Sequence, residues 1–259
     1  MNRMIVAMIL LASMTACHEK NSTEFVETKI VGDVKVTWLQ DNDEPRLMPR
    51  ELFADAPDSL MQALNLQDGV PSSVSTFLIE KDGKKMLFDA GLPDGKTADR
   101  LESIGIQTND IDYIFVTHAH GDHIGGLLVD GQARYSNAEL YISELEHNAW
   151  LENELYQAVA AAYKPHCFAF GDELPCGVKP INAVGHTPGH TAYLVGNVLV
   201  AGDFVHGAAL QLEHSEYCAN FDQDKEQAIA SRKMLLEQAQ TNHWLVLGMH
   251  LPVPAFLQK

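Results

Sequence analysis

Three histidines and one aspartate fall close together in the segment 117–126, Thr-His-Ala-His-Gly-Asp-His-Ile-Gly-Gly. Neutral imidazole and carboxylate are good ligands for zinc and similar divalent metals. In an extended chain His118 and His120 project to the same side, so one cation could bind both. Asp122 and His123 follow a glycine that lets the backbone turn, so they could face a neighbouring metal. Packing alone explains this density poorly, because each buried imidazole would need its own hydrogen-bond partner.

The same segment matches the H-x-H-x-D-H signature of the metallo-β-lactamase superfamily, and four other motifs extend the resemblance. Phe88–Gly91 resembles the family's Asp-x-Gly at the end of a strand, and residues 185–190 (Gly-His-Thr-Pro-Gly-His) resemble its second histidine motif. Residues 201–203 (Ala-Gly-Asp) resemble its bridging-aspartate motif, and residues 248–250 (Gly-Met-His) match its final histidine. Each of these four motifs is weak alone, but their order and rough spacing agree from about residue 34 to residue 252.

The resemblance implies two adjacent metal sites, each with three protein ligands, joined by one bridging carboxylate. The ligands of the first site are then His118, His120 and His186, those of the second are Asp122, His123 and His250, and the bridge is Asp203. The expected cofactors are two divalent metal ions, with zinc as the expected metal. Outside the ligand set, Asp89 is expected to hold the histidine-rich loop, and His190 is expected to support the site rather than bind metal.

The chemistry of such a site follows from charge. Two cations ~3.5–4 Å apart can trap a bridging water and lower its pKa towards neutrality. The hydroxide would attack a carbonyl or phosphoryl centre while the metals stabilise the charge that develops on the substrate oxygen. Asp122 is the expected catalytic residue, because it could orient the nucleophile or move a proton.

Within the superfamily, the second half of the chain is most similar to the methyl parathion hydrolase-like and lactonase-like branch. The similarity lies in residues 203–206 (Asp-Phe-Val-His), in the long helix expected after them, and in residues 248–252 (Gly-Met-His-Leu-Pro). The resemblance therefore implies a dinuclear metal-dependent hydrolase that uses a metal-bridging hydroxide on an ester, lactone or phosphotriester bond.

The substrate is expected to be a neutral small molecule bound among apolar side chains. Residues 180–224 and 237–258, which carry the later ligands, contain no Lys or Arg that could clamp an anion. The basic residues of the first half that could still reach the pocket are Lys96, Arg100, Arg134 and Lys164. The expected pocket residues are Trp150, Phe204 and His206.

Three alternative functions differ in what they need from the sequence. A glyoxalase II-like thioesterase or a β-lactamase would use the same ligands, so the motifs do not separate them from an esterase. A flavodiiron-type redox protein would need a carboxylate in place of one histidine and an added flavin domain, and neither is present. A non-enzymatic, envelope-anchored metal-binding protein would bind metal without turnover.

The elements that must position these residues alternate between strands and helices in both halves of the chain. This pattern predicts an α/β fold, a four-layer αβ/βα sandwich of two mixed β-sheets with outer helices. Asp-Gly at residues 82–83 predicts a hairpin turn. Strands are expected at 34–39, 74–80, 85–89, 112–117, 140–142, 178–184, 192–195, 198–201 and 244–247, and helices at 97–104, from Ser143 to before Pro165, and at 222–240.

The composition suits one large globular domain. The chain has 259 residues, of which 46% are hydrophobic, enough for a sizeable core. Its 35 acidic and 18 basic residues give a net charge of −17, which disfavours a nucleic-acid partner. Cys167 and Cys176 could form a disulfide or, with Cys218, remain free thiols. The oligomeric state is left open.

The N-terminus is typical of an exported bacterial protein. Residues 1–16 are predicted to be a signal peptide, because the basic residue Arg3 is followed by an apolar run. That run is shorter than a membrane-spanning helix needs. Met-Thr-Ala-Cys at 14–17 resembles a lipobox, so Cys17 is the expected lipidation site; a plain cleaved signal or a signal anchor is the alternative. Residues 17–30 would then form a lipidated tether and residues 31–259 a periplasmic catalytic domain, held at a membrane only by its lipid.

Overall fold

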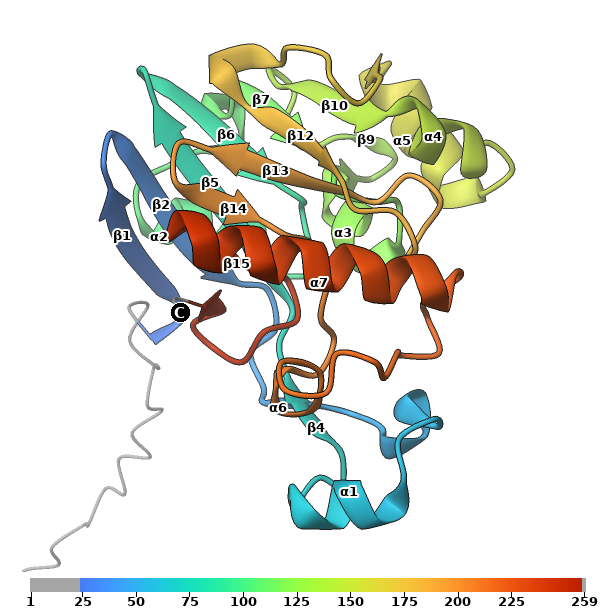
Figure 1. Cartoon of the computed structure of the whole chain (residues 1–259). Helices are drawn as coiled ribbons and strands as arrows, with labels where there is room; N and C mark the ends of the chain where they lie inside the picture. The colour runs from blue at the N-terminus through green and yellow to red at the C-terminus, as the bar shows by residue number, and fades with distance from the viewer. Residues whose placement is uncertain (1–23, 258–259) are drawn as a thin grey trace, which may run out of the picture.

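Two mixed β-sheets form the centre of the molecule (Figure 1). The computed structural model describes residues 24–257. The first sheet has the order β1-β2-β5-β6-β7-β10-β11, and the second has the order β12-β13-β14-β15-β16. The strands of the first are β1 Val26–Val31, β2 Val34–Gln40, β5 Ser75–Lys81, β6 Lys84–Phe88, β7 Tyr113–Phe115, β10 Glu139–Ser143 and β11 His166–Phe168. Those of the second are β12 Lys179–Asn182, β13 Thr191–Val195, β14 Val198–Val200, β15 Leu245–Leu247 and β16 Phe256–Leu257.

The pairing of the strands decides where the motif loops emerge. In the first sheet β1, β2, β5 and β6 pair antiparallel, and β6, β7, β10 and β11 pair parallel. In the second sheet β14 and β15 pair parallel, while the other pairs are antiparallel. The loops that leave β7, β14 and β15 carry residues 117–126, Asp203 and His250. The backbone amide of Thr191 donates to the carbonyl of Thr117 (2.9 Å), which ties these sheet ends together.

An apolar core fills the space between the two sheets. Phe88 and Phe115 of the first sheet stack at 5.2 Å between ring centroids, and Tyr193 of the second meets both at 5.6 and 5.5 Å. The Tyr193 hydroxyl donates to the carbonyl of Val116 (2.7 Å), so the buried phenol is not left without a partner. Aromatic residues of both sheets thus pack together just behind the histidine-rich loop.

Helices cover the outer faces of both sheets, which confirms the four-layer α/β sandwich. A second apolar cluster, with Leu101, Ile124 and Tyr156, lies between the first sheet and its helices. Helix α7 runs across the second sheet (Figure 1), and its buried residues have the spacing of one helix face: Ala228, Arg232, Leu235 and Ala239. The helices are α2 Thr97–Ser103, α3 Gly121–Ile124, α4 Glu144–Ala149, α5 Glu154–Tyr163, α6 Ala208–Gln211 and α7 Lys225–Asn242.

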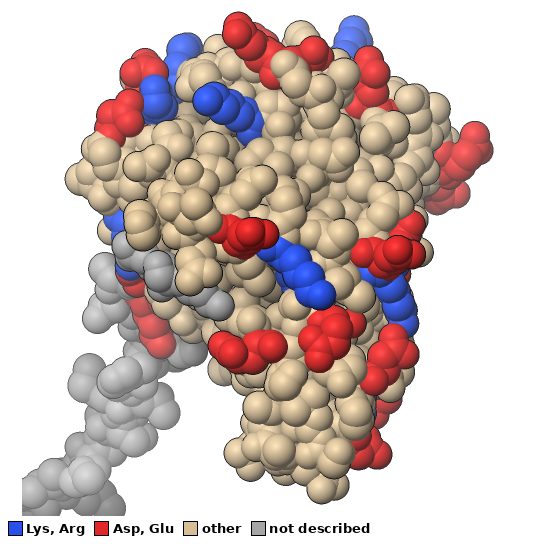
Figure 2. All heavy atoms as spheres, viewed as in Figure 1, with Lys and Arg blue, Asp and Glu red and all other residues tan. Residues whose placement is uncertain are grey.

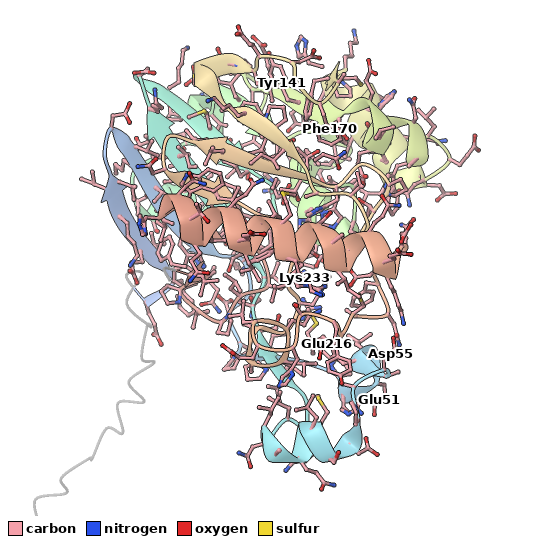
Figure 3. The ribbon with its side chains drawn as sticks, viewed as in Figure 1. Glu51, Asp55, Tyr141, Phe170, Glu216 and Lys233 are labelled. Carbon is pink, nitrogen blue, oxygen red and sulfur yellow. The ribbon has the colours of Figure 1, made fainter. Side chains whose placement is uncertain are left out.

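A small unit of residues 46–72, here called the β3–β4 unit, projects from the sandwich at the bottom of Figure 1. It has its own core of Met48, Phe53 and Met61, which packs on Leu210 of α6. Figure 3 labels Glu51 and Asp55 on this unit, near Glu216 and below the end of α7. Asp55 forms an ion pair with Lys225 (2.5 Å). The unit consists of β3 Arg46–Met48, η2 Arg50–Phe53, α1 Asp58–Ala63 and β4 Val70–Ser72, and none of these was predicted from the sequence.

Several sequence expectations about the elements are confirmed. The turn between β5 and β6 contains Asp82 and Gly83 with φ of 53° and 75°, the left-handed conformation that an Asp-Gly hairpin needs. The expected strands are present within a few residues of their predicted ends. The remaining short elements are η3 Thr108–Asp110, η4 Gly125–Leu127, η5 Pro175–Gly177, and the ribbon of β8 Leu128–Val129 with β9 Gln132–Ala133.

Two element boundaries differ from expectation. Strand β1 begins within the expected tether of residues 17–30 and pairs with β2 over six residues, so the last residues of that tether belong to the sheet. The helix expected from Ser143 to before Pro165 is two helices, because Trp150 leaves the helical conformation and Asn153 starts α5 by accepting from the amide of Tyr156. The predictions for the signal peptide and for Cys17 lie outside the described residues.

Over the described range, no helix is long and apolar enough to cross a membrane. Cys167 is exposed, Cys176 is partly exposed and Cys218 is buried, and all three are free thiols.

Candidate metal centre

Asp89 shapes the loop that carries the first histidines. Its side chain accepts from the amide and hydroxyl of Thr117, at 2.8 and 2.7 Å, and from Nδ1 of His123 at 2.7 Å. Both Asp89 and His123 are only 1% exposed. When the His123 ring is neutral, as a metal ligand must be, this contact fixes its tautomer, because Nδ1 donates to the carboxylate and the lone pair is then on Nε2. This is the supporting position that the sequence assigns to Asp89.

The three histidines of the first predicted triad meet at one point. Nδ1 of His120 lies 3.0 Å from Nε2 of His118 and 3.0 Å from Nε2 of His186. The two Nε2 atoms lie 3.2 Å apart. Two nitrogens bound to one tetrahedral zinc at ~2.0–2.1 Å would be roughly 3.3 Å apart. The spacing of the triad is therefore close to what a single zinc ion requires.

The second predicted triad faces the first across Asp203. Nε2 of His250 lies 3.4 Å from Oδ2 of Asp122, and Nε2 of His123 lies 3.8 Å from Oδ1 of Asp122. These three side chains can bind one metal together. Asp122 and His123 come from the start of α3, while His250 comes from the loop after β15. Asp122 also lines the open cavity in front of the site.

Asp203 lies between the triads and reaches both. Its Oδ1 is 3.3 Å from Nε2 of His123. Its Oδ2 is 3.5 Å from Nε2 of His186 and 3.0 Å from Nε2 of His250. One carboxylate with nitrogens of both triads near its oxygens has the arrangement expected of a bridging ligand.

His190 holds the bridging residue in place and does not join a triad. Its Nδ1 donates to the carbonyl of Ala183 (2.9 Å), and its Nε2 accepts from the amide of Asp203 (3.0 Å). Both ring nitrogens are therefore used. A Cβ on the neighbouring Gly202, which has φ of +57°, would lie only 2.5 Å from this Nε2, so a side chain there would displace His190.

Unpartnered buried atoms gather at the centre of the site. Within residues 24–257, Nε2 of His123, Oδ1 of Asp203 and both ring nitrogens of His206 are buried and have no hydrogen-bond partner. Buried polar atoms are normally satisfied, and a metal ion satisfies a lone pair as a hydrogen bond does. The orphaned atoms of His123 and Asp203 thus fit a metal centre. His206 lines the cavity as predicted, its Nε2 lies 3.3 Å from Oδ2 of Asp203, and with His186 and Asp203 it could also hold a metal.

The two triads differ in their electrostatics. Burial lowers the pKa of His118 well below its usual value, and it lowers the pKa of both His120 and His186 to about 4. Burial also opposes charge on His123 and His250, but nearby carboxylates, Asp203 foremost, outweigh it. The pKa of His123 is therefore well above its usual value and that of His250 is raised to about 10. The first triad offers neutral lone pairs, and the second attracts a cation.

The carboxylates show the complementary shifts. Burial alone would raise the pKa of Asp203 and Asp122, but the neighbouring His123 and His250 hold both well below the usual range. Both side chains are therefore ionised at neutral pH, as metal ligands must be.

Two carboxylates that the sequence interpretation missed support the histidines from behind. Asp222, expected to begin a helix, instead accepts from Nδ1 of His186 at 2.9 Å and lies 3.4 Å from the guanidinium of buried Arg232. Glu146 of helix α4 accepts from the amide of Ala119 and from the amide of Gly189, each at 2.9 Å. Glu146 therefore ties the two histidine motifs together, a link between distant segments that local spacing cannot reveal.

An open cavity of about 450 Å³ lies in front of the metal ligands. Of the three expected pocket residues, His206 lines it. Phe204 does not, because its ring belongs to the core between the sheets. Trp150 does not either: it lies edge-on to His120 at 5.2 Å and packs against the cluster under the outer helices. The apolar wall is formed instead by Met48, Leu92, Pro93 and Phe221.

The cavity also contains a basic residue that the sequence interpretation overlooked, Arg46 of β3. None of the four basic residues considered from the sequence lines it. Lys96 pairs with Asp99 and Arg100 pairs with Asp43. Arg134 donates to backbone carbonyls, and Lys164 ends helix α5.

Two curated bacterial proteins are similar to this chain over part of its length. The exodeoxyribonuclease WalJ of Streptococcus pneumoniae is 35% identical over 114 residues, which are 44% of this chain and 41% of that protein. An N-acyl homoserine lactonase of Bacillus thuringiensis is 30% identical over 112 residues, which are 40% of this chain and 42% of the lactonase. The chain thus spans about two fifths of the length of these curated relatives.

Solved structures match over more of the chain. The structure described as hydrolase AbOPH in the beta lactamase superfamily has a TM-score of 0.81 and 26% identity, and the match covers 90% of this chain and 92% of that one. AidC, described as a dizinc quorum-quenching lactonase, has a TM-score of 0.80 at 21% identity over 89% and 92% of the two chains, a likeness of fold alone. The family model described as Metallo-beta-lactamase superfamily matches residues 69–247. That range holds every predicted metal ligand except His250, and the protein belongs to the metallo-beta-lactamase superfamily.

Proposed function

We propose that the protein is a dinuclear metal-dependent hydrolase that cleaves an ester or lactone bond, with zinc as its metal. One observation carries the proposal: ionised Asp203 lies between a triad of three histidines and a triad of Asp122, His123 and His250. Seven side chains arranged in this way suit two divalent cations. When bound, such cations act as Lewis acids and lower the pKa of a coordinated water towards neutrality.

The chain's own residues would bind the substrate and move the proton. Asp122 lines the cavity, keeps 23% of its side chain exposed and stays ionised, so its free oxygen can accept a proton from the attacking water. His206 lines the same cavity with unpartnered ring nitrogens, so it can donate a hydrogen bond to the substrate's oxygen. The loop of His206 is held still, because its amide and that of Gly207 both donate to Oε1 of Gln211, at 2.8 and 2.9 Å.

The shape and surface of the molecule support a small-molecule substrate. A cavity of about 450 Å³ is within the ordinary range for a small-ligand site. On the face shown in Figure 2, Lys and Arg side chains occur singly among Asp and Glu and form no continuous basic surface for a nucleic-acid backbone. The relatives named as lactonases support an ester or lactone, and the relative named as an exodeoxyribonuclease makes DNA the alternative to test.

Metal analysis and a substrate screen test the proposal together. Protein purified without chelator and saturated with zinc is expected to hold about two metal ions per chain. It should then be assayed on lactones, aryl esters, phosphotriesters, a glutathione thioester, a β-lactam and single-stranded DNA. A stoichiometry that never exceeds one metal contradicts the dinuclear site, and two bound metals without turnover of any of these substrates support a metal-binding protein instead.

A variant of the bridge sharpens the result. Asp203→Asn is expected to lose second-site occupancy and turnover together, because its amide nitrogen cannot bind a metal. Asp68→Asn is the matched control, since Asp68 is exposed and lies outside the cavity lining. Unchanged two-metal binding and turnover in Asp203→Asn contradict the bridging role.

A further inference from the structure

Arg46 differs from the other arginines that the structure describes. Arg50 donates to the carbonyls of Phe53 and Ala56, and Arg134 donates to that of Gly126. Arg100 and Arg232 each pair with an aspartate. Within residues 24–257, Arg46 alone among arginines has neither an ion pair nor a side-chain hydrogen bond, so its five N–H donors have no protein acceptor.

This unpaired guanidinium lies in the wall of the cavity of the candidate metal centre. Arg46 is the only Lys or Arg among the described residues that line the cavity. It also lines a neighbouring surface cavity with Leu47 and Val253, which places it at the rim rather than among the metal ligands. The nearby Asp43 cannot neutralise it, because that carboxylate pairs with Arg100.

The fold holds Arg46 in this position. Strand β3 pairs with β4, where Arg46 faces Ser72, and the Ser72 hydroxyl donates to the carbonyl of His250 (3.1 Å). Arg46 and Met48 project to one side of β3 and both line the cavity, while Leu47 between them is 54% exposed. The strand therefore presents one cation and one apolar side chain to the site, and it is tied to the loop of a predicted metal ligand.

We propose that Arg46 forms a binding subsite for an anionic oxygen group, a carboxylate or a phosphonate-like group, on the part of the substrate away from the bond that is cleaved. The planar guanidinium matches such groups with two parallel charge-assisted hydrogen bonds. Met48, Leu92 and Phe221 leave an apolar stretch of wall for the part of the substrate in between. This inference rests on the proposed function, and it replaces the expected neutral substrate with an ester or lactone that carries one acidic group.

Matched aryl esters test the subsite on the zinc-loaded full chain. The neutral probe is 4-nitrophenyl butyrate, and the acidic probes are the mono-4-nitrophenyl ester of glutaric acid and its analogue with a terminal phosphonate. The variants are Arg46→Met and Arg46→Lys. The control is Lys233→Met, which removes an equal charge from the exposed face of α7 (Figure 3).

The wild type is expected to favour at least one acidic ester over the neutral ester by about tenfold or more in kcat/KM. Arg46→Met should remove this preference through KM, so that kcat/KM falls at least about tenfold more for the acidic ester than for the neutral ester. Arg46→Lys should retain part of the preference, and Lys233→Met should retain all of it. If Arg46→Met loses activity selectively on the carboxylate ester or on the phosphonate ester, that ester identifies the group that the subsite binds. The subsite is refuted if the wild type shows no acidic preference or if Arg46→Met keeps it.

Binding of the corresponding 4-nitroanilides separates this inference from the proposed function. These amides resist hydrolysis, so their dissociation constants can be measured by calorimetry whether or not the enzyme turns over an ester. Arg46→Met should weaken binding of the acidic anilide at least about tenfold more than binding of the neutral anilide. If no ester is cleaved but Arg46→Met still weakens the acidic anilide selectively, the proposed reaction is contradicted and the subsite is supported. If esters are cleaved but the acidic and neutral anilides respond alike to each substitution, only the subsite is contradicted.

Discussion

The substitution Asp89→Asn isolates the contribution of one buried carboxylate to one metal site. Asp89 accepts three hydrogen bonds, two from Thr117 and one from Nδ1 of His123. An asparagine keeps one acceptor oxygen, so its NH₂ group must face at least one of these donors. Hydrogen bonds to a charged group contribute about 1.5–3 kcal/mol each, so the variant should lose at least that much stability.

The same change should weaken the second metal site selectively. Without the carboxylate, His123 no longer has a fixed tautomer, and a proton on Nε2 would block the nitrogen that faces Asp122 and Asp203. Loss of an outer carboxylate partner typically reduces metal affinity about 10- to 100-fold, or about 1.4–2.7 kcal/mol. The first triad is linked to Asp89 indirectly, through Thr117, whose hydroxyl lies 3.1 Å from Nδ1 of His118, so it should lose less affinity than the second triad.

Competition titration with a chromophoric chelator measures both zinc affinities. Asp222→Asn is the mirrored control, because Asp222 accepts from His186 of the first triad and should weaken that site instead. The reasoning is refuted if Asp89→Asn binds two zinc ions with wild-type affinity, or if both variants weaken both sites equally.

Three further predictions test packing, charge and location. Gly126→Ala would place its Cβ 2.0 Å from the backbone carbonyl oxygen of Ala90, so we expect a loss of more than about 2 kcal/mol in urea unfolding. Arg232→Met leaves buried Asp222 without its cation, and we expect a loss of about 3–5 kcal/mol by the same measurement, partly restored by adding Asp222→Asn. Outside the described residues, Cys17→Ser should abolish partition into detergent if Cys17 is lipidated, and wild-type protein with an unmodified mature N-terminus contradicts that proposal.

The sequence is informative about the ligands because ligands come in short, regular motifs. The spacing of His118, His120, Asp122 and His123 is local, so the chemistry of that segment can be read without knowing the fold. His250 is distant, and only the resemblance to a family connected it to the others. The sheet order was not needed for either step, and the structure brings all these side chains together.

The cavity wall was predicted less well, because it depends on pairings between distant segments. Met48 reaches the cavity because β3 pairs with β4 and the β3–β4 unit packs on α6. Nothing in the periodicity of residues 41–72 indicates that packing. Phe204 follows Asp203 directly and was expected in the pocket, but its ring packs in the core between the sheets and does not line the cavity. Proximity along the chain was a poor guide to proximity in the site.

Charge connects the metal centre to the subsite at Arg46. Carboxylates gather in and directly behind the centre, with Asp122 and Asp203 among the predicted ligands and Asp89, Asp222 and Glu146 behind them, and Arg232 is a buried guanidinium beside Asp222. Burial opposes a charge on His250, but its contacts with Asp203 and Asp122 outweigh burial and raise the pKa of His250 to about 10.

Two divalent cations would add four positive charges close to the substrate, so they would stabilise the negative charge that develops during ester hydrolysis. Arg46 adds a further unneutralised positive charge at the rim of the same cavity. A chain with a net charge of −17 can therefore present a locally positive pocket, because the acidic residues that dominate its surface are screened over about 10 Å and the pocket's charges are close to the substrate. The overall charge thus gives no ground for excluding an acidic substrate, and the charges inside the cavity favour one.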